Sequence, residues 1–385
     1  MTSSTVEHAR FLSEEIGPRP PTSVGEARAA QYCFGVLERS GLSPRLEPFI
    51  GLRTFGHIYI PPTLGLLASA LLAARKRSPR LLALTLGSLS VATIWGENSS
   101  RWRPLMRRVA RGASQNVVAV IPAAKETRGR LVLTAHTDSS RSGWVFSPTQ
   151  AKSFRRNSIR ALWGGVAGIW SLLLPRTLRR IVAAVSACIT GTSLALMLQR
   201  ELLGEDVDGA SDNASGVSVV LSAADALSQQ RPEHTEVWVV LTGCEESDRV
   251  GMEAFLDRHA KALEGAWFLG VDSVAGRGAT LRWITRSGLL DEFRSDYRLT
   301  HLAEEVALQH PSLGASPGVW RTAGLDTDSA TARGFNTMSL MALTPEGTLP
   351  NWHWPTDTFE NLDTDGLNEC VDFTVALVRK FDQQS

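Results

Sequence analysis

Short apolar runs alternate with helical patterns along the C-terminal half of this chain. Four runs are typical of buried strands: 235–243, 267–272, 279–285 and 335–343. Helical spacing covers the segments 216–229, 251–263, 291–309 and 364–382. Strands separated by helices build sheets that are covered on both faces. The sequence therefore predicts an α/β fold with a mixed, mostly parallel central sheet and helices on both faces.

The N-terminal half contributes to the same fold. Helical spacing is found at 4–16 and 24–40, and strand patterns at 45–49, 116–122 and 130–136. The first residues contain early acids and lack an apolar core of the signal-peptide type. We therefore expect the N-terminal segment to stay in the cytoplasm.

Two pairs of uncharged apolar segments interrupt this pattern. The first pair is 58–74 and 81–96, joined by ARKRSPR, and the second is 161–175 and 181–198, joined by RTLRR. We predict one catalytic domain over residues 1–385, with helical hairpins inserted at 57–113 and 141–205.

A surface helix of a soluble protein has a charged face, and none of the four segments has one. Gly164 and Gly168 form a GxxxG pattern of the kind that packs membrane helices together. Arginines gather on the catalytic side of the hairpins: Arg101, Arg103, Arg107, Arg108, Arg111, Arg155, Arg156 and Arg160. This bias favours hairpins inserted in a membrane with the catalytic domain in the cytoplasm. The alternative is a soluble four-helix subdomain, packed on the enzyme or in a homo-oligomer contact.

Polar residues follow the predicted strands or lie in the loops beside them. They are His136-Thr137-Asp138, Asp212-Asn213, Glu245-Glu246, Asp272 and His353. Ligands of such sheets gather at the carboxyl ends of the strands. Imidazole and carboxylate groups are zinc ligands, and two ions that share a carboxylate can drive hydrolysis. Each residue alone also fits a structural histidine, a solvated acid or a helix cap, but together they indicate a paired-metal hydrolase.

Two spacings add chemical detail. Asp138 lies two positions after His136, where a carboxylate can hold the second imidazole nitrogen of a metal ligand. Neighbouring side chains diverge in an extended segment, so Glu245 and Glu246 can serve as base and ligand respectively. The net charge of +1 gives no reason to expect a nucleic-acid partner. The four cysteines match no zinc-finger spacing, and we expect reduced, mostly buried thiols.

These motifs resemble the co-catalytic zinc aminopeptidase family, which includes bacterial leucyl aminopeptidases, glutamate carboxypeptidase and glutaminyl cyclases. The resemblance spans nearly the whole chain outside the apolar pairs. The motifs that carry it are EIGPRPPTSVGEARAAQYCFGVLERSGL, SQNVVAVIP, LVLTAHTDSS, DGASDNASGVSVVL, VVLTGCEESDRVGMEAF, LGVDSVA, GLDTDSATARGFNTMSL and HWPTDTFENLD.

The resemblance implies two zinc ions bridged by Asp212. His136 and Asp272 would complete one site, and Glu246 and His353 the other. It also implies that Glu245 is the general base and that Asp138 orients His136. A peptide or aminoacyl substrate with a free amine would then be expected.

Two departures from the family pattern bear on the substrate. The stretch SATARGFNT lacks the aromatic residue and the Gly-Ile-Pro that often occupy it, and no tyrosine lies in the family's position near the carbonyl oxygen. The substrate pocket and the group that stabilises the oxyanion are therefore unassigned. The alternatives are a glutaminyl-cyclase-like acyltransferase with one zinc, another zinc amidohydrolase or carboxypeptidase, and a catalytically silent binding protein.

Overall fold

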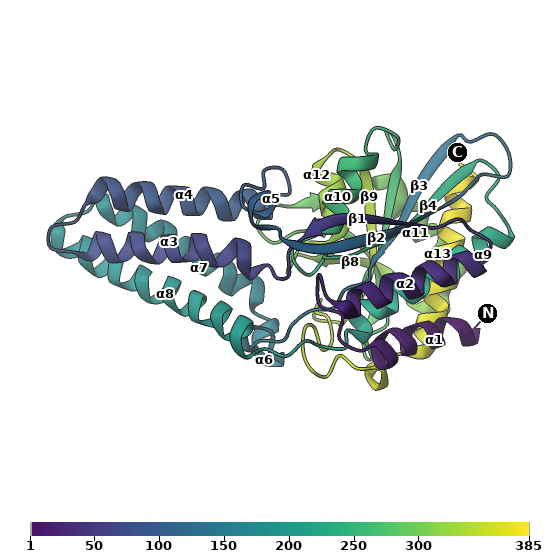
Figure 1. The fold of residues 1–385 in the computed structure, drawn as a ribbon, viewed down its shortest axis with the longest axis horizontal. Helices are drawn as coiled ribbons and strands as arrows, with labels where there is room; N and C mark the ends of the chain where they lie inside the picture. Colours follow the sequence, from purple (N-terminus) through teal and green to yellow (C-terminus); the bar gives the residue numbers. More distant parts are fainter. Residues whose placement is uncertain (1, 385) are drawn as a thin grey trace.

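The computed structural model describes residues 2–384. An α/β body and an elongated extension of four helices make up the molecule (Figure 1). Both chain termini lie at the end of the body that faces away from the extension (Figure 1).

The body contains a nine-stranded sheet in the order β1-β2-β4-β3-β5-β9-β6-β7, with β8 paired to β6. Its strands are β1 (Arg45–Gly51), β2 (Gly112–Ile121), β3 (Gly129–His136), β4 (Thr235–Thr242), β5 (Trp267–Val271), β6 (Thr280–Ser287), β7 (Phe293–Arg294), β8 (Ser316–Trp320) and β9 (Asn336–Leu343). The four central strands β4, β3, β5 and β9 are parallel, and β2 and β6 flank them in antiparallel orientation. The expected mixed α/β fold is confirmed.

The parallel direction of the central strands determines where the polar side chains that follow them lie. In the β3–β4 pair, Gly129 lies opposite Thr235 and His136 opposite Thr242, so both strands end at the same edge. The strand β5 pairs with the other side of β3 in the same direction. The residues that follow these three strands are therefore brought together, as expected for an α/β sheet.

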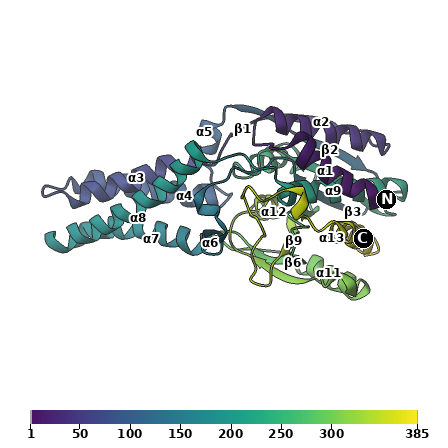
Figure 2. The same cartoon turned by 90° about the horizontal axis from the view of Figure 1, so that it is seen from below.

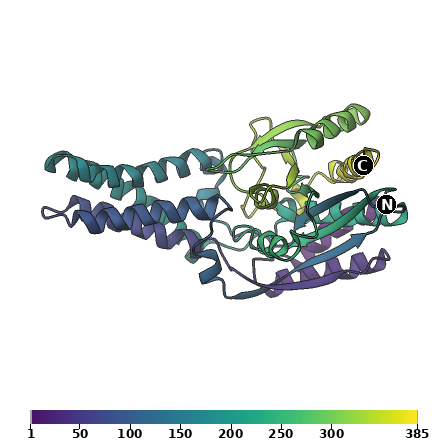
Figure 3. The ribbon, with the colours of Figure 1, turned by 90° about the horizontal axis from the view of Figure 1, so that it is seen from above.

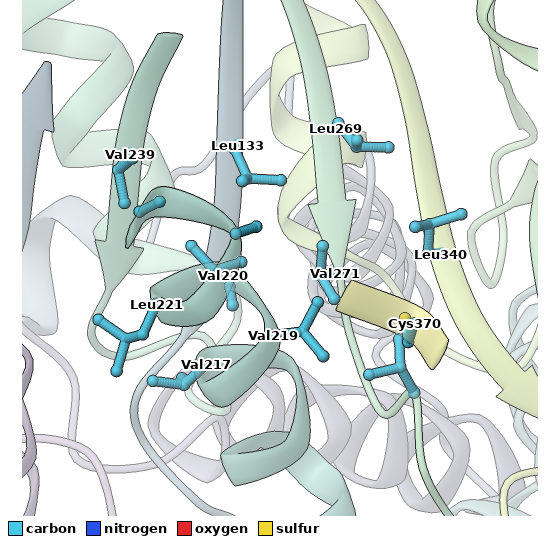
Figure 4. Packing of buried hydrophobic residues seen from close by; sticks show 14 of the residues in the cluster. Leu133, Val217, Val219, Val220, Leu221, Val239, Leu269, Val271, Leu340 and Cys370 are labelled. Carbon is cyan, nitrogen blue, oxygen red and sulfur yellow. The ribbon is translucent and has the colours of Figure 1, made fainter. Parts of the chain in front are cut away.

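Helices cover both faces of the sheet. One face is covered by α1 (Thr2–Arg10), α2 (Val24–Arg39), α9 (Gly216–Gln229), α11 (Tyr297–Gln309) and α13 (Thr364–Asp382). The other face is covered by α10 (Val250–His259) and α12 (Asp326–Ala332). Because side chains alternate along a strand, Leu131 and Leu133 pack on the first face and Val132 on the second. Figure 4 shows Leu133, Leu269 and Leu340 of the sheet around the valines of α9.

Some element boundaries differ from those expected. The helix predicted from Asp291 begins at Tyr297, because the Asp296 side chain accepts hydrogen bonds from the first free N–H groups of the helix. Residues before it form the short strand β7, which pairs with β6. The strand β8 was not predicted; its Pro317 and Gly318 obscure the strand pattern.

The extension consists of two hairpins. Its helices are α3 (Gly56–Ala74), α4 (Arg80–Asn98), α7 (Phe154–Trp170) and α8 (Arg176–Leu203). They project from the same side of the body in Figures 2 and 3. As predicted, the GxxxG glycines pack against another helix. A Cβ atom on Gly164 would lie 2.7 Å from Cγ2 of Ile189, and one on Gly168 would collide with Oγ of Ser186, both on α8.

The outer surface of the extension is apolar. Large exposed side chains include Leu64, Leu71, Leu81, Leu82, Leu84, Leu89, Trp163, Trp170, Leu173, Leu178, Ile181 and Val185. The buried cluster near the tip is small and consists of Ala73, Ala83, Leu172 and Ala183. Within residues 2–384, α3 and α8 are the two helices that are long and apolar enough to cross a membrane.

All four cysteines are free thiols, as expected. Cys33, Cys244 and Cys370 are buried in the body, whereas Cys188 is exposed on α8.

Candidate metal centre

The predicted site residues meet at the carboxyl edge of the parallel strands. His136 is the last residue of β3, and Asp272 directly follows β5. Glu245 and Glu246 follow β4, Asp212 precedes α9, and His353 lies in the loop after β9. Residues separated by more than two hundred positions along the sequence thus converge on one place.

The first group of side chains contains His136, Asp212 and Asp272. Nε2 of His136 lies 3.2 Å from Oδ1 of Asp212 and 3.7 Å from Oδ1 of Asp272. The potential ligand atoms of the group all lie within 4.8 Å of one another. Such a spacing suits a set of donors around one cation.

The second group contains Asp212, Glu246 and His353. Nε2 of His353 lies 3.2 Å from Oδ2 of Asp212 and 3.1 Å from Oε2 of Glu246. The ligand atoms again lie within 4.8 Å of one another. The two groups share Asp212, which directs one carboxylate oxygen to each histidine. This is the arrangement expected of a carboxylate between two cations.

The chemistry of these donors fits metal ions. Nε2 of His136 and Oε1 of Glu246 are buried and have no hydrogen-bond partner among the described residues. Unpaired buried polar atoms and converging carboxylates are unfavourable without a compensating charge. Zinc is coordinated by imidazole nitrogen and carboxylate oxygen. The residues present therefore fit zinc.

Asp138 supports the centre in two ways. Its main-chain carbonyl lies 3.1 Å from Nδ1 of His136, while its carboxylate lies 3.6 Å from the same nitrogen. The carboxylate accepts hydrogen bonds from the backbone N–H groups of Glu245 (3.0 Å) and Glu246 (2.9 Å). When Nδ1 donates to the carbonyl, Nε2 keeps a free lone pair for a metal. Asp138 thus positions His136 and both glutamates.

Glu245 lies beside the two groups of donors. His136, Glu245 and Glu246 form a further set with ligand atoms within 4.8 Å of one another, and Glu245 also lines the adjoining cavity. Removal from water raises the pKa of Glu245 well above its ordinary value; nearby acids add to this effect, and His136 opposes it. A bound cation would favour the carboxylate form that a base requires.

Asp357 and Asn213 hold the loop that carries Asp212. The Asp357 carboxylate accepts hydrogen bonds from the N–H groups of Ser211 (2.7 Å) and Asp212 (3.1 Å). Asn213 donates to the carbonyl of Val271 at 3.0 Å, which ties the loop to the end of β5. The sequence analysis gave neither residue a role, although both lie in motifs that carry the resemblance.

Two charged residues near the N-terminus hold backbone segments next to the site residues through hydrogen bonds. Glu26 is buried and accepts hydrogen bonds from the N–H of Cys244 (2.8 Å) and the hydroxyl of Ser114 (2.9 Å). Arg19 is also buried and donates to the carbonyls of Thr137 (3.0 Å) and Gly209 (3.0 Å). Neither residue was predicted to belong to the site. The spacing of Ser23 and Glu26 is that of a capping box, which conceals the second role of Glu26.

Comparison with known proteins relates part of the chain to a known family. Residues 192–378 match the family model described as Peptidase family M28. No curated protein sequence matches significantly.

Solved structures share the fold. BSAP, a zinc aminopeptidase from Bacillus subtilis, has a TM-score of 0.57 at 16% identity, over 98% of this chain and 94% of that chain. LapB from Legionella pneumophila has a TM-score of 0.58 at 13% identity, over 99% of this chain and 72% of that chain. Tannerella forsythia glutaminyl cyclase has a TM-score of 0.56 at 15% identity, over 98% of each chain.

The family match, together with the fold and the paired donor groups, supports a metallopeptidase hydrolase. More particularly, residues 192–378 match peptidase family M28. The resemblance to the co-catalytic zinc aminopeptidase family is confirmed.

Proposed function

We propose that this protein is an aminopeptidase with two zinc ions bridged by Asp212. His136 and Asp272 would complete one zinc site, and Glu246 and His353 would complete the other. The observation that carries the proposal is the pair of donor groups joined by one carboxylate. The zinc ions, when bound, acidify water and polarise the scissile carbonyl.

Glu245 is the proton carrier of the proposed reaction. It takes a proton from the attacking water and delivers it to the departing amine nitrogen. Asp138 holds the backbone of Glu245 and so fixes where its carboxylate stands. The carboxylates around the centre would attract the free amine of the substrate, which favours exopeptidase action.

The test is hydrolysis of aminoacyl p-nitroanilides by zinc-loaded protein. The Glu245→Gln variant should lose about 10²–10⁴-fold in kcat, the usual contribution of a general base, while keeping its zinc content. The matched control Glu304→Gln changes an exposed glutamate and should keep full activity. If zinc-loaded protein cleaves no free-amine substrate in a broad panel, the proposal is wrong.

A glutaminyl-cyclase-like reaction is the second candidate, because solved glutaminyl cyclases share this fold. Such an acyltransferase would work with one zinc. Two bound zinc ions per chain, measured by elemental analysis, support the aminopeptidase, and one ion together with cyclisation of N-terminal glutamine supports the cyclase.

We infer, further, that the extension enters a lipid bilayer and leaves the catalytic domain on the cytoplasmic side. The nineteen residues of α3 span about 28 Å, close to the ~30 Å hydrocarbon thickness, and α8 is longer. The uncharged segment of α4 ends at residue 96, so Glu97 lies outside it. Large apolar side chains cover the outside of all four helices, as on a lipid-facing surface. Arg103 does not add to the basic surface, since it is buried beside Asp248 and Glu253 at 3.6 Å from each.

Cys188 offers a direct test of this inference, since it is the exposed cysteine within residues 2–384 and lies midway along α8. In membranes, a charged maleimide should fail to label Cys188 until the protein is unfolded. A Glu264→Cys variant in the exposed body, on a Cys188→Ala background, should be labelled at once. Rapid labelling of Cys188, or a soluble oligomer obtained without detergent, contradicts membrane insertion.

A further inference from the structure

The metal centre opens into a cavity that continues into the helical extension. The cavity has a volume of about 300 Å³ and is lined at one end by Asp212, Glu245, Glu246, Asp272 and His353. At its other end it is lined by residues of α3, α4, α7 and α8. The extension is therefore a wall of the active site as well as an attachment to the body.

The part within the extension, which we call the helical chamber, is walled by apolar atoms. Its walls include Leu66 of α3, Ala161 and Leu162 of α7, and Met197 of α8. The hydroxyl of Thr63, another lining residue, donates to the carbonyl of Tyr59 at 2.7 Å. Threonines bonded in this way to their own helix leave their methyl groups for packing.

Two further hydroxyls of the chamber are engaged within the protein. Thr190 donates to the carbonyl of Ser186 at 2.8 Å. The phenol of Tyr59 donates to Asp248 at 3.1 Å. These groups are thus satisfied within the protein, and a polar ligand would gain little from them.

The charged residue that the extension adds to the cavity is also engaged. The guanidinium of Arg200 lies 4.1 Å from the centre of the Phe55 ring and donates to Thr54 (3.0 Å) and Glu201 (2.8 Å). It lies at the end of α8 nearest the body. Beyond it, toward the tip, the lining residues of the described helices are apolar or uncharged.

The size of the cavity bears on what can fill it. A volume of about 300 Å³ is at the lower end of small-molecule sites and about twice that of a 150 Å³ apolar cavity that holds benzene. One ordinary apolar side chain would leave much of the cavity empty. A flexible alkyl chain could fill it from the metal centre inward.

We propose that the substrate carries a long alkyl chain, which lies in the helical chamber while the scissile amide lies at the metal centre. This proposal rests on the proposed peptidase function and names its substrate class. A membrane-inserted extension would let such a chain enter from the lipid side, although the cavity alone carries the proposal.

The test compares chain lengths on both sides of the amide. One series holds p-nitroanilides of 2-aminoalkanoic acids with side chains from methyl to decyl, and the other holds leucine n-alkylamides from butyl to dodecyl. In one of the two series kcat/KM should rise about 3- to 4-fold per methylene, the factor expected for burial of a CH₂ group. Alkyl-chain detergents must be absent, because they would compete for the chamber. Flat profiles in both series overturn the proposal.

A pair of variants on α7 locates the effect. Ala161→Trp fills the chamber and should flatten the chain-length dependence. Ala167→Trp places the same bulk on the exposed side of the helix and should leave the profile unchanged. If Ala161→Trp and Ala167→Trp show the same dependence of kcat/KM on chain length, the alkyl chain does not bind in the helical chamber.

A binding measurement separates failure of this proposal from failure of the proposed function. Calorimetric titration of the full-length protein with butylamine, octylamine and dodecylamine needs no turnover. Tighter binding with length, weakened by Ala161→Trp and kept in Ala167→Trp, supports the chamber even if no substrate is cleaved. Cleavage of short substrates together with length-independent binding overturns the chamber and leaves the peptidase in place.

Discussion

Glu97 joins the base of the extension to the body through one buried carboxylate. Its Oε1 accepts hydrogen bonds from the N–H groups of Leu105 and Met106, and its Oε2 has no partner within residues 2–384. Burial raises the pKa of Glu97 to about 7, and these hydrogen bonds limit the rise. A proton on Glu97 therefore stabilises the fold.

This pKa predicts a pH-dependent stability. The folded protein holds the proton more tightly than the unfolded chain, so the contribution is full below the ordinary pKa of Glu97 near 4.5 and is lost as pH rises through about 7. Glu97→Gln keeps an acceptor without the charge. The variant should match the wild type at pH 5 and exceed its stability by up to about 3 kcal/mol at pH 8.

Unfolding of both proteins at the two pH values checks this prediction. The exposed Glu264→Gln serves as control and should show no such difference. A Glu97→Gln variant that is less stable than wild type at pH 8 would show that the carboxylate is needed in its charged form.

At the scale of elements, the contact between α7 and α8 depends on the absence of side chains. A Cβ on Gly164 would meet Ile189 at 2.7 Å, whereas a Cβ on Gly191 would find Leu67 at 3.8 Å, an ordinary contact. Gly164→Ala should therefore destabilise the extension by about 1–3 kcal/mol through overpacking. Gly191→Ala should stabilise it by up to about 1 kcal/mol through helix propensity.

Thermal melts of the two variants test this contrast within one bundle. Equal shifts in Tm would mean that the two helices can move apart freely. Helix packing would then not explain why the glycines of α7 face α8.

Sequence patterns predict the main strands and helices of the body well. The strands and helices of the body follow local periodicity, because each buries one face against a neighbouring layer. The helix at 297–309 starts later than predicted, since Asp296 competes for its first N–H groups. Short elements such as β8 depend on pairing with distant strands and have no local pattern of their own.

For the whole molecule, the metal ions are expected to be part of the fold. The five ligands come from segments between residues 136 and 353, and three of them are acids. Without cations these closely spaced carboxylates repel one another. A ligand that binds only the folded chain stabilises it by about 4 kcal/mol at a concentration 1,000 times its Kd.

Chelation should therefore lower Tm, and added zinc should restore it. Asp212→Asn removes the shared carboxylate charge and should weaken metal binding. Chelator should therefore lower the Tm of this variant less than the Tm of the wild type. The Glu304→Gln control should respond like the wild type. A wild-type Tm that is independent of chelator and zinc would contradict a structural contribution of the metals.

The sequence alone determined the α/β class, the order of the main elements and the seven residues proposed for metal binding and catalysis. Apolar periodicity and the position of acids and imidazoles after strands are local properties, so they can be read along the chain. The roles of Arg19, Glu26 and Asp357 were decided by the tertiary structure, because each acts through backbone groups more than a hundred residues away. The same holds for the helical chamber: its walls come from both hairpins and become an active-site wall only when the extension folds against the body.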